Sequence, residues 1–131
     1  MDAALYAALN VASVVGAGKA TGVHRFRAPL TANLPVVVFG LMDSEDAYVM
    51  PGRAFVRMNY MIKVIEAGLS ASTAATLADT IDSLITNVAL TVTGYTLMVG
   101  RRVRLIGYIE DADSETYQHV GGEYEFMLDP T

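Results

Sequence analysis

Two histidines and one glycine–lysine segment are the residues whose types could carry chemistry in this sequence. His24 and His119 lie in separate segments and lack the short spacing, such as HxxxH, that brings two imidazoles to one metal ion. Residues 15–20 (VGAGKA) are similar to a phosphate-binding loop, but Ser13 stands at the position of the first glycine and Ala20 replaces the hydroxyl residue that reaches magnesium. We interpret this segment as the loop that ends a helix. We therefore expect no catalytic residue, no metal site and no cofactor, and predict that the chain is not an enzyme.

Charged side chains gather at a few places along the chain. Residues 43–46 and 110–113 are acidic, but neither segment has the ligand spacing of an EF-hand calcium loop, and we interpret both as solvated turns. Seven arginines stand against two lysines, and arginine is the basic residue that protein interfaces favour. A charge-complementary contact with a neighbour is one interpretation of this set, and a solvated face is the other. The candidate interface residues are Arg53, Arg57, Arg101, Arg102, Arg104, Asp43, Glu45 and Asp46.

The composition is that of a chain that can fold without cross-links. Its 131 residues indicate a single domain, residues 1–131, and 53% of them are hydrophobic, which is enough for a core. The sequence contains no cysteine, so disulfides, thiolate metal sites and cysteine nucleophiles are excluded. A net charge of −5 argues against a protein that binds nucleic acid mainly through phosphates. Because Asp2 has the wrong sign for a signal peptide and the apolar runs are short, we expect neither secretion nor a membrane span.

Hydrophobic periodicity predicts the elements that would position these residues. Helices are expected over 2–14 and over 71–88, where apolar residues recur on one helical face. Strands are expected over the ranges 22–27, 34–41, 54–66, 90–93, 95–110 and 115–128, and a polar loop over 43–53. The predicted fold class is α+β: a mostly antiparallel sheet with the main helix packed on it, a short N-terminal helix and a long C-terminal hairpin. Strands of this length exceed what a small core needs, so we expect them to reach a neighbouring subunit.

The order of these elements resembles that of the tail-completion, or tail-terminator, proteins of long-tailed bacteriophages. The resemblance extends over nearly the whole chain. It rests on an Ala- and Leu-rich opening helix, on the apolar strand that Pro35 introduces (LPVVVFG), on the alternating strand from Phe55 to Val64 and on the helix that follows. The chain closes on a hairpin with an acidic turn (EDAD, 110–113) and a last strand that contains YQHV (117–120).

The resemblance implies a structural role without catalytic residues. Such proteins form a ring, commonly a hexamer, at the head-proximal end of the finished tail, where the ring stops tube polymerisation and joins the head. The implied partners are other copies of the chain, the tail-tube protein and the head–tail connector protein, while DNA passes through the lumen without specific binding. The implied location is the virion, after synthesis in the host cytoplasm. A tail-tube subunit or a connector protein is one alternative, and a small-molecule-binding α+β domain with a pocket between the 71–88 helix and the sheet is the other.

Overall fold

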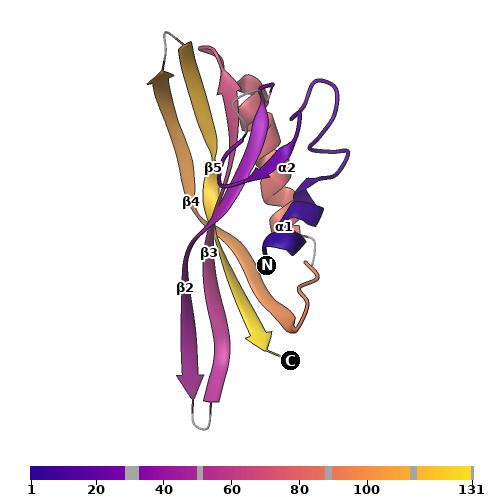
Figure 1. Ribbon diagram of the computed structural model, residues 1–131, viewed down its shortest axis with the longest axis vertical. Coiled ribbons are helices and arrows are strands. Elements are labelled where there is room, and N and C mark those ends of the chain that lie inside the picture. Colours follow the sequence, from indigo (N-terminus) through magenta and orange to yellow (C-terminus); the bar gives the residue numbers. More distant parts are fainter. Residues whose placement is uncertain (29–32, 50–51, 88–89, 113–114, 131) are drawn as a thin grey trace.

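Five strands form one sheet, and two helices lie on a single face of it (Figure 1). This computed structural model describes residues 1–28, 33–49, 52–87, 90–112 and 115–130, and their side chains except those of 47–49, 52–54, 87 and 112. The elements are α1 (Asp2–Leu9), β1 (Val23–Arg25), β2 (Val36–Val49), β3 (Gly52–Ala67), α2 (Ser72–Asn87), β4 (Tyr95–Ala112) and β5 (Glu115–Pro130). The sheet order is β1-β2-β3-β5-β4, and every pair except β1–β2 is antiparallel. The predicted α+β class, the mostly antiparallel sheet and the long C-terminal hairpin are confirmed.

Every second residue of β3 and β5 builds the face of the sheet that carries the helices. Tyr60 and Ile62 of β3 are buried on this face, and so are Tyr124 and Phe126 of β5. The rings of Tyr60 and Phe126 meet edge to face with their centroids 5.9 Å apart. Successive residues of a strand point to opposite faces, so this buried set leaves the alternate residues of the same strands for the other face.

The main helix lays the predicted apolar stripe on this face. Leu77, Ile81 and Ile85 are buried, and each such side chain stabilises the fold by about 1.5–3 kcal/mol relative to leaving it exposed. The helix begins where Glu66, near the end of β3, accepts a hydrogen bond of 2.9 Å from the backbone N–H of Ala74. A carboxylate at this end also interacts favourably with the helix dipole, so Glu66 joins the end of β3 to the start of α2.

The sequence predicts an acidic loop over residues 43–53, but its described residues, 43–49 and 52–53, belong to two strands. β2 continues to Val49 and β3 begins at Gly52, and the two strands pair along this stretch from Asp43 onward. Their backbone groups satisfy one another across the hairpin, so strand structure persists where the side chains are polar. The expectation of a long polar loop is therefore wrong, and its carboxylates lie at fixed positions on the edge of a sheet.

The helix boundaries agree with the sequence in one case and not in the other. α2 matches the expected range of 71–88 to within one residue at each end. α1 ends at Leu9 instead of continuing to residue 14, and a bend and turns follow. The strand expected at 90–93 is reduced in the described residues to an isolated bridge between Val92 and Tyr95.

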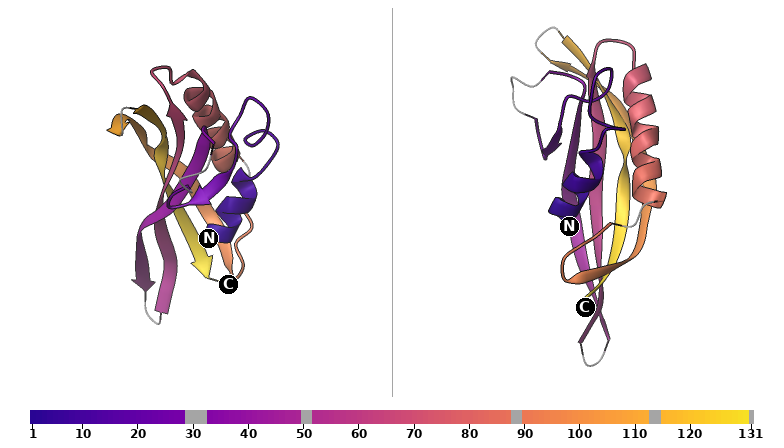
Figure 2. Two further views of the ribbon diagram at one scale, coloured as in Figure 1. Left: turned by 45° about the horizontal axis from the view of Figure 1, so that its top comes forward. Right: turned by 90° about the vertical axis from the view of Figure 1, so that its right-hand side faces the viewer.

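Two hairpins overrun the core at opposite ends of the sheet (Figures 1 and 2). β5 accompanies β3 only as far as Val56, so residues 52–55 of β3 pair with β2 alone. At the other end β3 stops at Ala67, opposite Tyr117, and the β4–β5 hairpin continues beyond it. No helix in the described ranges is long and apolar enough to cross a membrane.

Gly121 marks the closest approach of β5 to β3 and generates a stability prediction. A Cβ atom at this position would lie 2.1 Å from the carbonyl oxygen of Ile62 and 2.5 Å from the Cα of Lys63. Because backbone atoms cannot move aside as a flexible side chain can, Gly121→Ala should lower the free energy of unfolding by about 1–3 kcal/mol or more. Urea unfolding followed by circular dichroism measures the change. Gly107→Ala on β4 is the matched control, since nothing lies within 4 Å of its Cβ position, and equal losses in the two variants would contradict this packing.

Candidate assembly interface

A row of alternating charge crosses the open face of the sheet, the face without helices. Arg57 on β3 contacts Glu45 on β2 at 3.9 Å and Glu125 on β5 at 3.5 Å. Arg101 on β4 completes the row, because its Nη2 and Nε donate to one carboxylate oxygen of Glu125 at 2.9 and 3.2 Å. The signs therefore run negative, positive, negative, positive from β2 to β4.

A neighbouring row repeats these signs on three of the strands. Asn59 on β3 donates a hydrogen bond to Asp43 on β2, and Arg104 on β4 lies 3.6 Å from Glu123 on β5. Within the two rows, each strand carries charge of one sign. We call this set the charge ladder, and its members are Asp43, Glu45, Arg57, Glu123, Glu125, Arg101 and Arg104.

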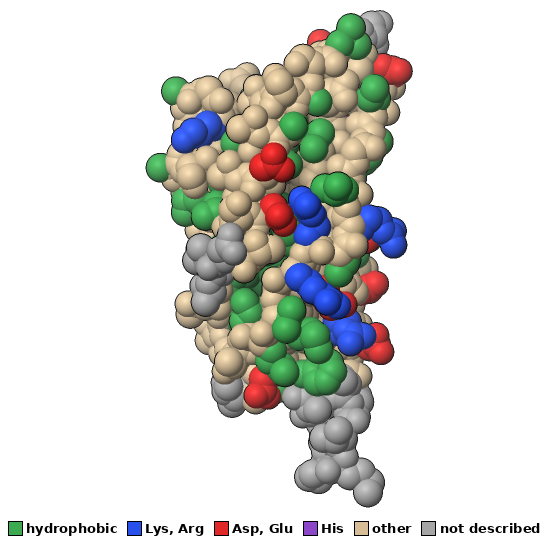
Figure 3. Space-filling view, turned by 180° about the vertical axis from the view of Figure 1, so that it is seen from behind, with side chains coloured by type: hydrophobic (Ala, Val, Ile, Leu, Met, Phe, Trp, Pro, Cys, Tyr) green, Lys and Arg blue, Asp and Glu red, His purple; other side chains and the backbone are tan. Residues whose placement is uncertain are grey.

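The register of the sheet explains why the ladder is aligned. Asp43 pairs with Asn59 across β2 and β3. Asn59 pairs with Glu125, and Glu125 pairs with Arg101, so one line crosses four strands. The line begins on an acidic residue of β2 and ends on a basic residue of β4. Figure 3, the view from behind, shows Lys and Arg side chains gathered in the middle of the molecule with acidic side chains among them.

The ladder contributes little to the stability of the single chain, because solvent reaches its outer members. The side chains of Arg101 and Glu45 are 64% and 74% exposed, whereas that of Glu125 between them is 14% exposed. Exposed ion pairs are worth about 0–1 kcal/mol, since water screens them. Within the described residues Arg57 Nε has no hydrogen-bond partner, so its 3.5 Å approach to Glu125 is an ion pair without hydrogen-bond geometry. The outermost charged groups are therefore available for contacts outside the chain.

Most of the candidate interface residues lie in the ladder, namely Asp43, Glu45, Arg57, Arg101 and Arg104. Arg102 directly follows Arg101 in register and therefore faces the helix side, 3.8 Å from Asp82 of α2, whereas the register shift between Arg102 and Arg104 returns Arg104 to the open face. Asp46 is paired with the core residue Val56 of β3, which puts it on the helix side of the hairpin as well. Arg53 belongs to β3, but its side chain lies outside the described residues.

Asp82 links Arg102 to a buried tyrosine. The hydroxyl of Tyr124 donates a hydrogen bond of 3.0 Å to Asp82. The same carboxylate forms an ion pair with Arg102 at 3.8 Å. Burial, followed by the charge of Asp82, raises the pKa of Tyr124 well above its ordinary value of 10.0, so the hydroxyl remains a donor. Arg102 therefore ties β4 to α2 within the chain, and differs in this from the ladder arginines on the other face.

His119 belongs to a buried polar cluster that the sequence did not reveal. It is 5% exposed and its ring stacks on Tyr108 with centroids 4.3 Å apart. Its Nε2 lies 3.2 Å from Glu110, and Lys63 donates a 2.7 Å hydrogen bond to the Tyr108 hydroxyl. Burial lowers the pKa of His119, aided by the charge of Lys63, while Glu110 acts in the opposite direction. The neutral ring donates from Nε2 to Glu110, because an ionised carboxylate can only accept a hydrogen bond. Within the described residues the other ring nitrogen, Nδ1, has no hydrogen-bond partner.

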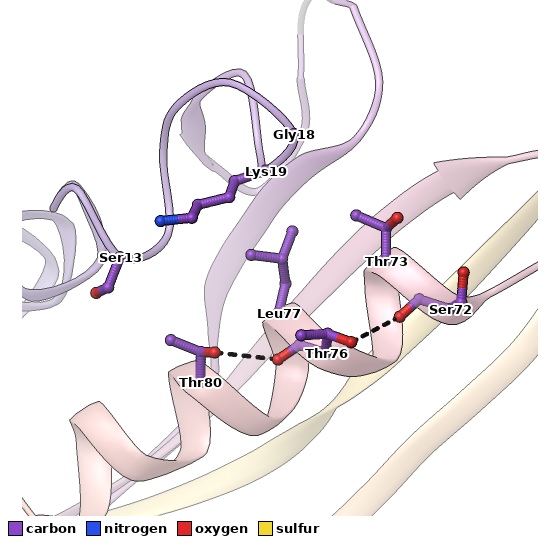
Figure 4. Close-up of a pocket in the computed structure, with 8 residues that line it drawn as sticks. All are labelled: Ser13, Gly18, Lys19, Ser72, Thr73, Thr76, Leu77 and Thr80. Atoms are coloured by element: carbon purple, nitrogen blue, oxygen red, sulfur yellow. Dashed lines mark hydrogen bonds between the residues drawn. The ribbon is translucent and has the colours of Figure 1, made fainter.

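The glycine–lysine segment lines a cavity of about 360 Å³ against α2 (Figure 4). Lys19 does not point free into this space, since its Nζ donates a 2.9 Å hydrogen bond to the carbonyl oxygen of Ala12. The hydroxyls of Thr76 and Thr80 donate to carbonyls of their own helix. The N-terminus of α2 is already occupied by the carboxylate of Glu66. These engaged groups agree with the interpretation of the segment as a loop that follows a helix.

Comparison with solved structures finds the same fold in another protein. A chain from the virion of a native gene transfer agent particle matches with a TM-score of 0.78 and 19% sequence identity, and the match covers 98% of this chain and 94% of that chain. No protein-family model matches the sequence, and no curated protein sequence matches it. In the described part of the chain, no three His, Cys, Asp or Glu side chains form a group that could hold a metal ion. The likeness to the gene transfer agent chain therefore shows a shared fold over essentially the whole chain.

Protonation of His119 is expected to destabilise the fold in mild acid. Its pKa in the folded protein lies below the ordinary value of 6.5, so the unfolded chain takes up a proton first as the pH falls. The stability conferred by the neutral ring is present above this value and is lost as the pH falls through 6.5 toward the folded pKa. The free energy of unfolding, measured in urea between about pH 7.5 and about pH 5.5, should therefore decrease. His119→Phe should reduce this slope and His24→Gln should retain it; the same slope in both variants would assign the loss to other groups.

Proposed function

We propose that the protein is a structural protein of a virion, a tail terminator that forms a homo-oligomeric ring on the end of the tail tube. The observation that carries the proposal is the fold shared with a gene transfer agent virion chain over 98% of this chain. The choice of terminator among virion parts rests on the order of helices and strands, which resembles that of tail-terminator proteins. The same resemblance makes a hexamer the ring size to test first.

The geometry of the sheet supports a ring of identical subunits. A ring needs two different surfaces that complement each other, because a head-to-tail contact closes when it is repeated by rotation. The two sides of this sheet differ in this way, with acidic ladder residues on β2 and basic ones on β4. The β2–β3 and β4–β5 hairpins overrun the core at opposite ends. We propose that one end contacts the tail-tube protein and the other the head–tail connector protein.

The charge of the chain supports passage of DNA through such a ring. The net charge of −5 gives the ring no excess of basic groups that would retain the phosphate backbone. Basic members of the ladder lie beside carboxylates, which further reduces their attraction for phosphates. We infer that DNA crosses the lumen without specific binding, and this role would place the protein in the virion at the head-proximal end of the tail.

The structure gives less support to a small-molecule-binding domain with a pocket between the main helix and the sheet. Leu77, Ile81 and Ile85 of α2 are buried in one cluster with Tyr60 and Phe126 of the sheet, and these side chains fill the interface. The cavity beside the glycine–lysine segment lies between that segment and α2, and a second, of about 500 Å³, lies over the open face of β2 and β3. A tail-tube subunit or a connector would use the same ring geometry as a terminator, so experiment must separate these roles.

The ring predicts a particle with a central hole and an effect on growing tubes. Light scattering at rising protein concentration should give a mass that is a multiple of the 14.0 kDa chain, and negative-stain electron microscopy should show rings. Added to a polymerising tail-tube protein, the rings should appear at tube ends and limit tube length, with bovine serum albumin as the inert control. A strict monomer that neither forms rings nor binds tube ends would refute the proposal. Growth of the purified protein alone into tubes would identify it as a tube subunit.

A further inference from the structure

The two sides of the sheet present long edges that no described strand covers. β4 pairs with β5 alone, so the outer edge of β4 has no partner strand in the described chain. β1 covers β2 only at residues 37–39, and from Leu41 onward the outer edge of β2 likewise lacks a described partner. Unpaired edges of this length are templates for strand addition by another chain.

Apolar side chains accompany both edges. On β4, Val103 and Leu105 are 49% and 68% exposed, and on β2, Leu41 and Met42 are 36% and 52% exposed. Side chains of this type are buried when a further strand is added to a sheet, because cross-strand neighbours come within contact distance. The exposed side chains therefore agree with an occupant that continues the sheet on each side.

The edges carry opposite charge at the same level of the sheet. The line of pairing that starts at Asp43 on β2 ends at Arg101 on β4. Glu45 lies to one side of this line, level with Val99, and Arg104 lies to the other side, level with Met61 of β3. Two β4 edges would bring arginines together, and two β2 edges would bring carboxylates together, which is unfavourable between adjacent strands. A β4 edge against a β2 edge instead continues the alternation of sign. The charges thus select a head-to-tail contact over both symmetric ones.

Strand direction favours the same contact. β2 is antiparallel to β3, β3 to β5 and β5 to β4, so β4 runs antiparallel to β2. A second copy that is added to the sheet in the same orientation as the first therefore places its β2 antiparallel to the β4 of the first copy. This is the pairing that the rest of the sheet already uses.

The geometry points to a second copy of this chain as the partner of these edges, with its β2 paired to the β4 edge of the first copy. The opposite charges of the two edges select this contact over contacts between like edges. Each copy then presents Asp43 to Arg101 of the next, with Glu45 and Arg104 diagonally adjacent to this pair, and the alternation of sign continues across the boundary. This inference deepens the proposed ring, on which it rests for closure, since the edge contact by itself is compatible with a ring or an open filament.

Charge reversal tests whether the charges of the two edges select the contact. In D43K/E45K both edges are basic, in R101E/R104E both are acidic, and each protein alone should lose self-association and show the mass of one chain. An equimolar mixture should regain assembly, with the two proteins alternating, and the chain with all four changes should assemble alone. D79K/E115K is the matched control, because it makes the same change in net charge as D43K/E45K at exposed residues outside the ladder. Circular dichroism and a melting curve establish that each variant is folded.

Cross-linking tests the contact without altering the ladder as a whole. The chain has no cysteine, so D43C and R101C each introduce a single thiol. In one chain the two positions are three strand spacings apart, about 14 Å, while across the inferred contact they lie on adjacent strands about 5 Å apart. A short bismaleimide should give dimers when the two variants are mixed and little product from either alone. Product from each variant alone would reveal like edges in contact and overturn the inference.

The two tests separate this inference from the proposed function. Rings that persist in electron micrographs of both charge-reversed variants, with no cross-link in the mixed cysteine variants, would overturn the edge contact and leave the ring in place. Open filaments with the expected cross-link would support the edge contact and count against a terminator ring. A wild-type chain that never self-associates, with or without tail tubes, would overturn both.

Discussion

Backbone N–H and C=O groups of a strand need partners on both sides, and the described chain supplies them fully only in the middle of its sheet. β3 and β5 have a strand on each side, whereas β4 and the distal half of β2 have one on a single side. The helices cannot relieve this, because they cover a face and not an edge. The proposed assembly of copies through these edges follows from this constraint.

The same two-residue period of the central strands produces both the core and the charged face. On β3 the buried Tyr60 lies three positions after Arg57, and on β5 the buried Phe126 follows Glu125 directly. Alternation places such neighbours on opposite faces, so packing of α2 on one side leaves the ladder exposed on the other. One pattern thus specifies which side chains form the core and which lie on the open face.

Charged residues on the two faces of β4 have different consequences. Arg102 contacts Asp82 beneath α2, where a buried tyrosine shares the carboxylate, and this group holds the chain together. Arg101 and Arg104 lie on the open face with most of their surface in water, where an ion pair adds little to stability. Charges that add little to the stability of one chain can still select which sheet edges pair in the proposed assembly, because a contact between like charges is unfavourable each time it is repeated.

The sequence by itself determined the features that depend on neighbours in the chain. The stripe of Leu77, Ile81 and Ile85 predicted α2, and the alternation before Val64 predicted β3, because both periods are local properties of the backbone. The α+β class and the choice of arginines as candidate contact residues followed from the same local patterns.

Only the tertiary structure decided how distant segments meet. Polar composition suggested a loop at 43–53, but pairing with β3 makes it strand and aligns Asp43 with Arg101. A register shift in β4 puts Arg104 on the opposite face from Arg102, and Tyr108, opposite in register, stacks on His119. Each outcome depends on which strand lies alongside and in what register, and the free energy that selects the register comes from the whole buried face.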